Sequence, residues 1–271
     1  MKLPEHNRYP FVPIGRRAQY EWPGGKRLAF YLAISSEQFA FGAGLGDDIS
    51  TLGAPQTQRN YGWRDYGQRV GLWNLIKTLK ALGLPLAHAV NGLLYTERRA
   101  LVERLSADGD EIIAHGRTSA ELQNDMWEHD EVHLIHEATA AIKAQTGTAP
   151  AGWLGPGFGE SRITPDLLKE AGYSYVLDWS ADDQPFWMKT RAGPLLSVPY
   201  PLELNDVTSL LHRRHSAREF EAMIVNQFEV MLEQSKRQPL VFALGLHAYV
   251  AGQPFRLRAL RRALKIGRAH V

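Results

Sequence analysis

Histidine and carboxylate side chains that could carry acid–base chemistry follow short apolar segments lying far apart in this chain. His115 comes directly after Glu111–Ala114, and His247 comes directly after Leu240–Leu246. Three further segments end in Ser35-Ser36-Glu37, in Trp153 and in Asp178-Trp179. In a chain of alternating strands and helices, the carboxyl ends of the parallel strands gather at one face. The sequence therefore predicts one catalytic site containing Glu37, His115, Asp178 and His247.

Imidazole and carboxylate groups held together can move protons to and from a reacting bond. Glu37, Asp178 and Asp182 are candidate bases for activating water, because an apolar cleft lined by tryptophan raises the pKa of a carboxyl group toward neutrality. His247 is the candidate general acid for a leaving nitrogen. His115 could polarise a carbonyl group or orient the base. These residue types fit general acid–base catalysis.

The segments that must position these side chains are of two kinds. Apolar runs predict strands over Arg27–Ser35, Leu84–Val90, Glu111–Ala114, Trp153-Leu154, Ser174–Leu177, Leu195–Val198 and Leu240–Leu246. Helical spacing predicts helices over Tyr66–Leu82, Glu97–Ser106, Glu128–Thr146, Thr164–Ala171, Ala217–Ser235 and Arg256–Leu264. About thirty residues rich in Gly, Asp, Ser and Gln follow the first strand and predict one long functional loop. The alternation predicts a parallel sheet in an α/β domain.

Composition narrows the classes of partner. The chain has 271 residues, 44% of them hydrophobic and 22% charged, which is typical of a globular protein. A net charge of +2 does not favour binding to nucleic acid or to a membrane surface, so we expect a small-molecule substrate. Assembly of identical copies stays open. The absence of cysteine excludes disulfides and thiolate metal sites. With no apolar signal segment near the start, we expect a cytoplasmic protein.

The last six residues are predicted to be foreign to the domain. Ile266-Gly-Arg-Ala-His-Val271 matches what one reading frame of a common sequencing-library adapter encodes. Such scars are excluded from reasoning about a fold. We therefore expect a single domain over residues 1–265, with residues 266–271 dispensable for its stability.

Several motifs resemble those of the polysaccharide deacetylase superfamily, and especially its allantoinase-like, metal-independent branch. They are Arg64–Val70, Asp110–Gly116, the Trp153 turn, Asp178-Trp179, Asp182–Trp187, Val198–Asp206 and Leu246-His247. The resemblance runs from about Trp22 to His247. It implies a distorted (β/α) barrel of about seven strands and hydrolysis of a carbon–nitrogen bond other than a peptide bond.

The chain departs from the family's metal site. Classical members bind a divalent metal through an Asp at the end of the first strand and through a His-x-x-x-His pair. Here Ser35-Ser36 ends the first strand, and Ser119 stands four residues after His115. A catalytic zinc ordinarily needs three protein ligands and one open position. We therefore predict no metal and no other cofactor, although a substitute ligand set of Glu37, His115 and His247 is conceivable.

Candidate substrate contacts come from the same motifs. They are Arg64, Arg69, Trp153, Trp179, Asp182, Asp183 and Asn205. Arg69 has an alternative interpretation of similar weight, as a surface ion pair with Asp65 one helical turn away. The run His129-Asp-Glu-Val-His133 lacks the Glu of a helical zinc-protease motif, and we predict that it lies on a solvated helix face, Glu131 included. Two rivals to the metal-free hydrolase stay open: a catalytically silent sugar- or ureide-binding barrel, and a metal-dependent N-deacetylase with a rearranged site.

Overall fold

The computed structural model describes residues 5–41 and 58–265 of the chain. The predicted tail of residues 266–271 and most of the predicted long loop lie outside the described residues. Eight strands form one curled sheet in the order β6-β7-β5-β4-β3-β2-β1-β8. Their bounds are β1 Leu28–Ser36, β2 Ala87–Val90, β3 Glu111–Ala114, β4 Gly152–Trp153, β5 Tyr175–Val176, β6 Phe186–Thr190, β7 Gly193–Ser197 and β8 Leu240–His247.

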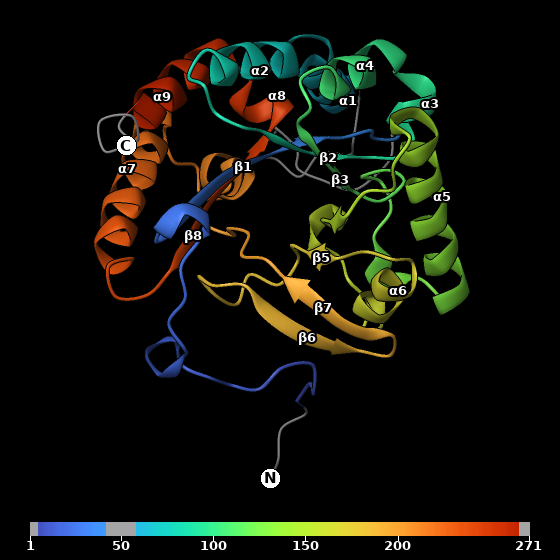
Figure 1. Ribbon diagram of the computed structural model, residues 1–271. Coiled ribbons are helices and arrows are strands. Elements are labelled where there is room, and N and C mark those ends of the chain that lie inside the picture. The colour runs from blue at the N-terminus through green and yellow to red at the C-terminus, as the bar shows by residue number, and fades with distance from the viewer. Residues whose placement is uncertain (1–4, 42–57, 266–271) are drawn as a thin grey trace.

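Helices surround the outside of this sheet, so that the predicted distorted barrel is confirmed (Figure 1). The helices are α1 Gln58–Tyr66, α2 Leu72–Lys80, α3 Leu94–Glu97, α4 Arg99–Ser106, α5 Glu128–Thr146, α6 Thr164–Glu170, α7 Ala217–Gln234, α8 Ala248–Ala251 and α9 Pro254–Lys265. Their apolar faces bury leucine and isoleucine side chains against the strands. No described helix is long and apolar enough to cross a membrane.

Seven of the strands are the predicted ones, and their pairings are all parallel. The eighth, β6, has no counterpart in the prediction and pairs antiparallel with β7. The two are joined by the two-residue turn Arg191-Ala192, which lacks the Asn-Gly or Gly-first signature of such hairpins. The glycine of this hairpin comes directly after the turn. Gly193 has a positive φ of 114°, which glycine adopts more readily than other residues. The hairpin therefore left little signal in the sequence.

The N-terminal segment is tied to the β6 side of the sheet. Lys189 on β6 donates its backbone N–H to the carbonyl of Arg8, and the Arg8 side chain pairs with Asp166 at 2.9 Å. Further along, Arg17 binds both carboxylate oxygens of Asp182, at 2.5 and 2.6 Å. The segment thus packs along the outside of the domain, and Figure 1 shows it in blue below β6.

The predicted helix over Tyr66–Leu82 is interrupted. Gly67–Gly71 form a π-helical turn between α1 and α2, and this turn lies directly against α8. A Cβ placed on Gly71 would lie 2.1 Å from the carbonyl oxygen of Ala248, and one on Gly67 would lie 2.7 Å from the backbone nitrogen of Tyr249. Only glycine permits such a close approach of two backbones. The contact fixes the start of α8, which follows His247 directly.

One prediction about α5 is wrong. His129 and His133 are exposed, but Glu131 between them is fully buried. Its carboxylate accepts hydrogen bonds from Gln123 at 2.9 Å, from Ser161 at 2.7 Å and from Thr164. A buried carboxylate needs such partners, and here they tie the start of α5 to the loop before α6. A helical face cannot be assigned from its charged residues alone.

Candidate active site

The register of four neighbouring strands brings the predicted catalytic residues together. In the order β8-β1-β2-β3, His247 lies opposite Ser35, Ser36 opposite Val90, and Val90 opposite Ala114. The residues that follow these positions are Glu37 after β1, Asn91 after β2 and His115 after β3. Parallel strands with aligned carboxyl ends therefore place one carboxylate, one amide and two imidazoles at the same edge of the sheet.

Glu37 and His115 form the buried centre of this group. The Nε2 atom of His115 lies 3.8 Å from Oε1 of Glu37. The Nδ1 atom of His115 donates to the carbonyl of Leu154 at 2.5 Å, so that Nε2 is the nitrogen that faces the carboxylate. Burial opposes ionisation of Glu37, but the imidazoles of His115 and His247 outweigh it and leave its pKa lowered. Glu37 is therefore ionised at neutral pH.

His247 is oriented by a carboxylate that is itself fully buried. Its Nδ1 donates to Oδ1 of Asp206 at 2.7 Å. Asp206 also accepts the backbone N–H of His247 at 2.9 Å and that of Ala251 at 3.0 Å. These bonds fix the ring and leave Nε2 as the nitrogen that can exchange a proton with a substrate. His247 and Asp206 thus form an oriented acid–base pair.

Asn91 joins the loops that carry Glu37 and His115. Its Oδ1 accepts the backbone N–H of Gln38 at 2.7 Å and the hydroxyl of Ser119 at 3.1 Å, and its Nδ2 donates to the carbonyl of His115. Ser119 thus serves this network at the position where classical members of the family have a metal ligand. A fully buried amide with all these bonds made rigidifies the site.

Asp178 approaches the site from β5 and pairs with a second carboxyl group. Both of its oxygens accept the backbone N–H of Gly155, at 2.8 and 3.0 Å. Burial raises the pKa of Asp178 to about 6. Hydrogen bonding with Gly155 and Glu160 and the charge of His115 oppose this shift, because they favour the ionised form. Burial and the neighbouring charge of Asp178 also raise the pKa of Glu160 well above its usual value. The four predicted catalytic residues thus belong to one group with Glu160 beside it.

The buried Tyr200 lies among three of these carboxylates. Burial raises the pKa of its phenol far above its usual range, and the charges of Asp206, Glu37 and Asp178 add to the effect. Tyr200 is therefore a neutral phenol at any ordinary pH, and it can serve the site only as a hydrogen-bonding group.

The candidate substrate contacts are divided between the site and other places. Arg64 is buried, with its guanidinium 4.0 Å from the centre of the Phe39 ring, and lines a small pocket together with Glu37. Arg69 has a side chain 77% exposed and pairs with Asp65 at 3.6 Å, as the alternative interpretation predicts. Trp153 is fully buried and packs edge-to-face on Tyr173 in the core.

The remaining candidates have structural partners. The Trp179 indole donates to Glu160 at 2.7 Å. Asp182 is held by Arg17, so that it is not free to act as a base, and with Asp183 it lines a separate groove between α7 and β8. Asn205 accepts the backbone N–H of Val207 at 3.0 Å and begins the turn that carries Asp206. Arg64 is the member of this set that shares a pocket with a predicted catalytic residue.

The family's metal centre is not reproduced by these residues. Within residues 5–41 and 58–265, no three His, Asp or Glu side chains are grouped so that they could hold a metal ion. Glu37, His115 and His247 are residue types that zinc accepts as ligands, but among the described residues they do not converge on one point. Ser119 supplies only a neutral hydroxyl, which it donates to Asn91. As placed here, these residues do not form a site with three ligands and an open position.

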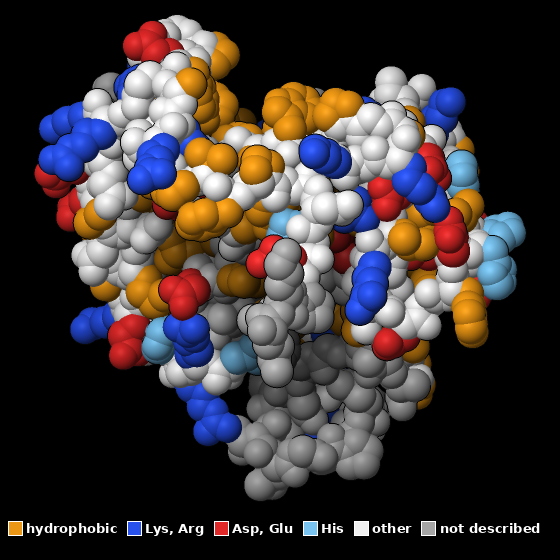
Figure 2. All heavy atoms as spheres, turned by 90° about the horizontal axis from the view of Figure 1, so that it is seen from below, with side chains coloured by type: hydrophobic (Ala, Val, Ile, Leu, Met, Phe, Trp, Pro, Cys, Tyr) orange, Lys and Arg blue, Asp and Glu red, His pale blue; other side chains and the backbone are white. Residues whose placement is uncertain are grey.

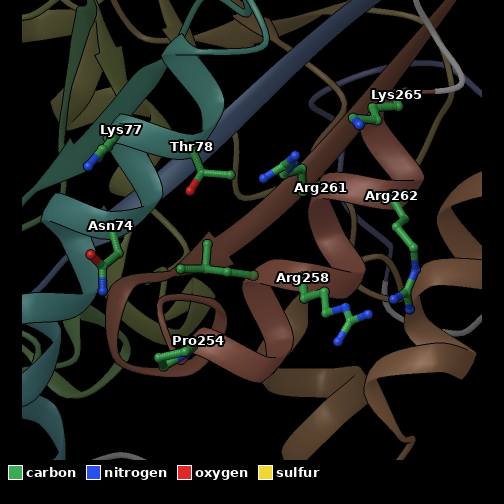
Figure 3. A pocket seen from close by; sticks show the side chains of 9 residues that line it. Asn74, Lys77, Thr78, Pro254, Arg258, Arg261, Arg262 and Lys265 are labelled. Atoms are coloured by element: carbon green, nitrogen blue, oxygen red, sulfur yellow. The ribbon is translucent and has the colours of Figure 1, made fainter.

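A second pocket lies away from the candidate site, on the outer face between α2 and α9 (Figure 3). Basic side chains line it, namely Lys77, Arg258, Arg261, Arg262 and Lys265. Arg262 is neutralised by Glu221, at 2.7 Å from its Nε atom. On the face of the molecule shown in Figure 2, acidic and basic side chains are interspersed among apolar ones. None of the predicted site residues lines the basic pocket.

Sequence reasoning missed Asn91, Glu160, Tyr200 and Asp206. Asn91 directly follows an apolar run, so the rule that found His115 could have found it as well. Asp206 ends the Val198–Asp206 motif, but nothing in the sequence indicates that its carboxylate turns toward His247. Glu160 and Tyr200 lie in loops, and only the three-dimensional structure brings them to the site.

Comparison with known proteins agrees with this fold. Residues 63–176 match the family model for polysaccharide deacetylase. This part of the chain carries a polysaccharide deacetylase domain, and solved structures of an allantoinase and of a polysaccharide deacetylase share the fold of nearly the whole chain.

Three proteins similar to this chain illustrate the relationship. The structure of PuuE allantoinase superposes with a TM-score of 0.85, at 26% identity, and the match covers 97% of this chain and 92% of that one. A "probable polysaccharide deacetylase" from Pseudomonas aeruginosa PAO1 gives a TM-score of 0.83 at 26% identity, covering 97% and 93%. A Schizosaccharomyces pombe protein described as "Putative polysaccharide deacetylase" is 24% identical over 259 residues, covering 89% of this chain and 80% of its own.

Proposed function

We propose that this protein hydrolyses a carbon–nitrogen bond in a small amide, ureide or N-acyl compound without a metal ion. The observation that carries the proposal is the position of Glu37, whose Oε1 lies 3.8 Å from Nε2 of His115. Both His115 and His247 are fixed through Nδ1 at the same edge of the sheet. The similarity to PuuE allantoinase supports a ureide among the substrate classes. Interspersed charges on the face shown in Figure 2 agree with a small rather than a polyanionic ligand.

In the proposed mechanism Glu37 accepts a proton from water as the water attacks the substrate carbonyl. His115 fixes this carboxylate and, through Nε2, can donate to the oxygen on which charge develops. His247, held by Asp206, delivers a proton from Nε2 to the leaving nitrogen. Oε2 of Glu37 is buried and has no hydrogen-bond partner among the described residues, which suits an oxygen that receives a water molecule.

A substrate panel tests this proposal. Simple amides, N-acetylated sugars, N-acyl amino acids and cyclic ureides are incubated with the protein and with Glu37→Gln, and release of amine or acid is measured. We expect turnover of at least one class, lost in Glu37→Gln. Binding of a panel member by calorimetry without turnover would instead indicate the catalytically silent barrel.

We expect metal removal to leave turnover unchanged. Ser35, Ser36 and Ser119 stand where family members have metal ligands, and Glu37, His115 and His247 do not converge on one point among the described residues, so we expect them to hold a divalent ion only weakly. Elemental analysis should find no stoichiometric metal, and dialysis against a chelator should not lower activity. One metal per chain, with activity lost on chelation and restored by zinc, would show that Glu37 or His247 is a ligand.

The pH dependence should follow Asp178. Its pKa of about 6 means that its charge near His115 is present above this pH and lost below it. We therefore expect kcat/KM to fall as the pH is lowered through about 6, and Asp178→Asn to show a low, flat profile over this range. An unchanged acid limb in Asp178→Asn would assign the limb to another group.

A further inference from the structure

Glu160 presents a buried carboxyl oxygen that no described donor reaches. Its Oε2 accepts the Trp179 indole N–H at 2.7 Å, while its Oε1 is buried and unpartnered among residues 5–41 and 58–265. Asp178, the residue before Trp179, carries the buried carboxyl group whose charge acts on Glu160. Both oxygens of Asp178 already accept the backbone N–H of Gly155. Two buried carboxyl groups can form a hydrogen bond only when one of them carries a proton.

The surroundings decide which carboxyl group holds that proton. Asp178 accepts a hydrogen bond from the Gly155 N–H and lies near the imidazole of His115, and both favour a carboxylate. Glu160 has one neutral donor, the Trp179 indole, and Arg8, a cation that acts on it, is paired with Asp166. The pKa directions agree, because that of Glu160 is raised well above its usual value and that of Asp178 to about 6.

We propose that Glu160 is a positioning residue that stays protonated at neutral pH and donates a hydrogen bond from its carboxylic acid to ionised Asp178. The pair then carries a single negative charge. Hydrogen bonds from Gly155 and Glu160 hold the Asp178 carboxylate in one orientation toward the site. Asp178 keeps one orientation and one charge state near His115, while the indole of Trp179 holds Glu160 in place. The consequence for catalysis rests on the proposed function, but the protonation state of the pair does not.

Glutamine is the informative substitution, because its amide can reproduce both contacts of the protonated acid. In Glu160→Gln the amide oxygen accepts from Trp179 and the amide nitrogen donates to Asp178. Glu160→Leu has a similar size and removes both contacts. Glu170→Gln, at an exposed glutamate paired with Arg191, is the matched control.

The first measurement needs no substrate. Infrared spectra of the protein alone at pH 7 should contain the carbonyl stretch of one buried protonated carboxyl group that is present in the control Glu170→Gln and absent in Glu160→Gln. Thermal unfolding of Glu160→Gln should match that of the wild type. Identical carboxyl bands in the wild type and Glu160→Gln would show that Glu160 is ionised and would overturn the proposal.

The second measurement uses the substrate identified with the panel. Glu160→Gln should keep kcat/KM within about threefold of the wild type, with the acid limb still near pH 6. Glu160→Leu should lose about tenfold, as expected for one buried hydrogen bond to a charged group, and its acid limb should move to higher pH. An acid limb that moves to lower pH in Glu160→Gln would mean that a negative charge has been removed beside Asp178, and would contradict the protonated state. A panel without turnover would leave the infrared result standing.

Discussion

Replacing His247 by alanine should lower kcat by about 10²–10⁴-fold, the usual contribution of a positioned general acid. The leaving nitrogen would then depart without a proton from Nε2, while Glu37 and His115 keep their places. The side chain of His247 is 14% exposed, and without it Asp206 keeps its hydrogen bonds from the backbone N–H groups of residues 247 and 251, so its loss should leave the fold intact. Circular dichroism and the Tm test this directly, and kcat on a substrate identified with the panel gives the effect.

The matched control is His129→Ala, at an exposed position on α5. It should leave kcat and Tm unchanged. Asp206→Asn should also lower kcat, because the ring of His247 would lose the acceptor that fixes it. A His247→Ala protein that keeps more than a tenth of the wild-type kcat would remove His247 from the proposed mechanism and leave general acid catalysis to another group.

Gly71→Ala should be among the most destabilising single substitutions in the chain. Its Cβ would lie 2.1 Å from the carbonyl oxygen of Ala248, and a backbone atom cannot move aside as a side chain end can. Overpacking of this kind costs about 1–3 kcal/mol and sometimes more. Because Ala248 follows His247, the displacement should also lower kcat. Chemical denaturation gives the change in the free energy of unfolding.

Gly62→Ala serves as the control, since Gly62 lies in α1 and an added Cβ would meet nothing within 4 Å. This change should be neutral or stabilise the protein by about 0.5–1 kcal/mol, the usual gain of alanine over glycine in a helix. Equal effects of the two substitutions would mean that the π-helical turn does not rest on α8 as closely as its glycines indicate.

The fold followed from the sequence because its main signals are local. The apolar runs that become β1, β3 and β8 and the amphipathic spacing of α5 and α7 need no partner to be recognised. Strand ends then indicated Glu37, His115, Asp178 and His247 without knowledge of any distance. The hairpin of β6 and β7 had no such signal, because its turn lacks the usual glycine or asparagine residues.

The residues that orient the catalytic side chains could not be predicted in this way. Asp206 reaches His247 from a turn, and Glu160 reaches Asp178 from a loop, so neither is marked by periodicity. Arg69 and Asp182 show the opposite error. Their residue types suit substrate binding, but Asp65 and Arg17 engage them elsewhere. Sequence indicates which groups can react, whereas tertiary contacts decide which of them remain available.

The pairing of β1 with β8 has a consequence for how the protein is made. These strands are paired over eight positions, from Leu28–Leu240 to Ser35–His247, although nearly the whole chain separates them. During synthesis β1 is complete long before its neighbour leaves the ribosome, and one edge of this largely buried strand stays unpaired meanwhile. Such exposed edges promote association between chains, and contacts so distant in sequence form slowly. A nascent chain interrupted before Leu240 would therefore present an open apolar edge. It would also contain the proposed base, Glu37, without the proposed general acid, His247.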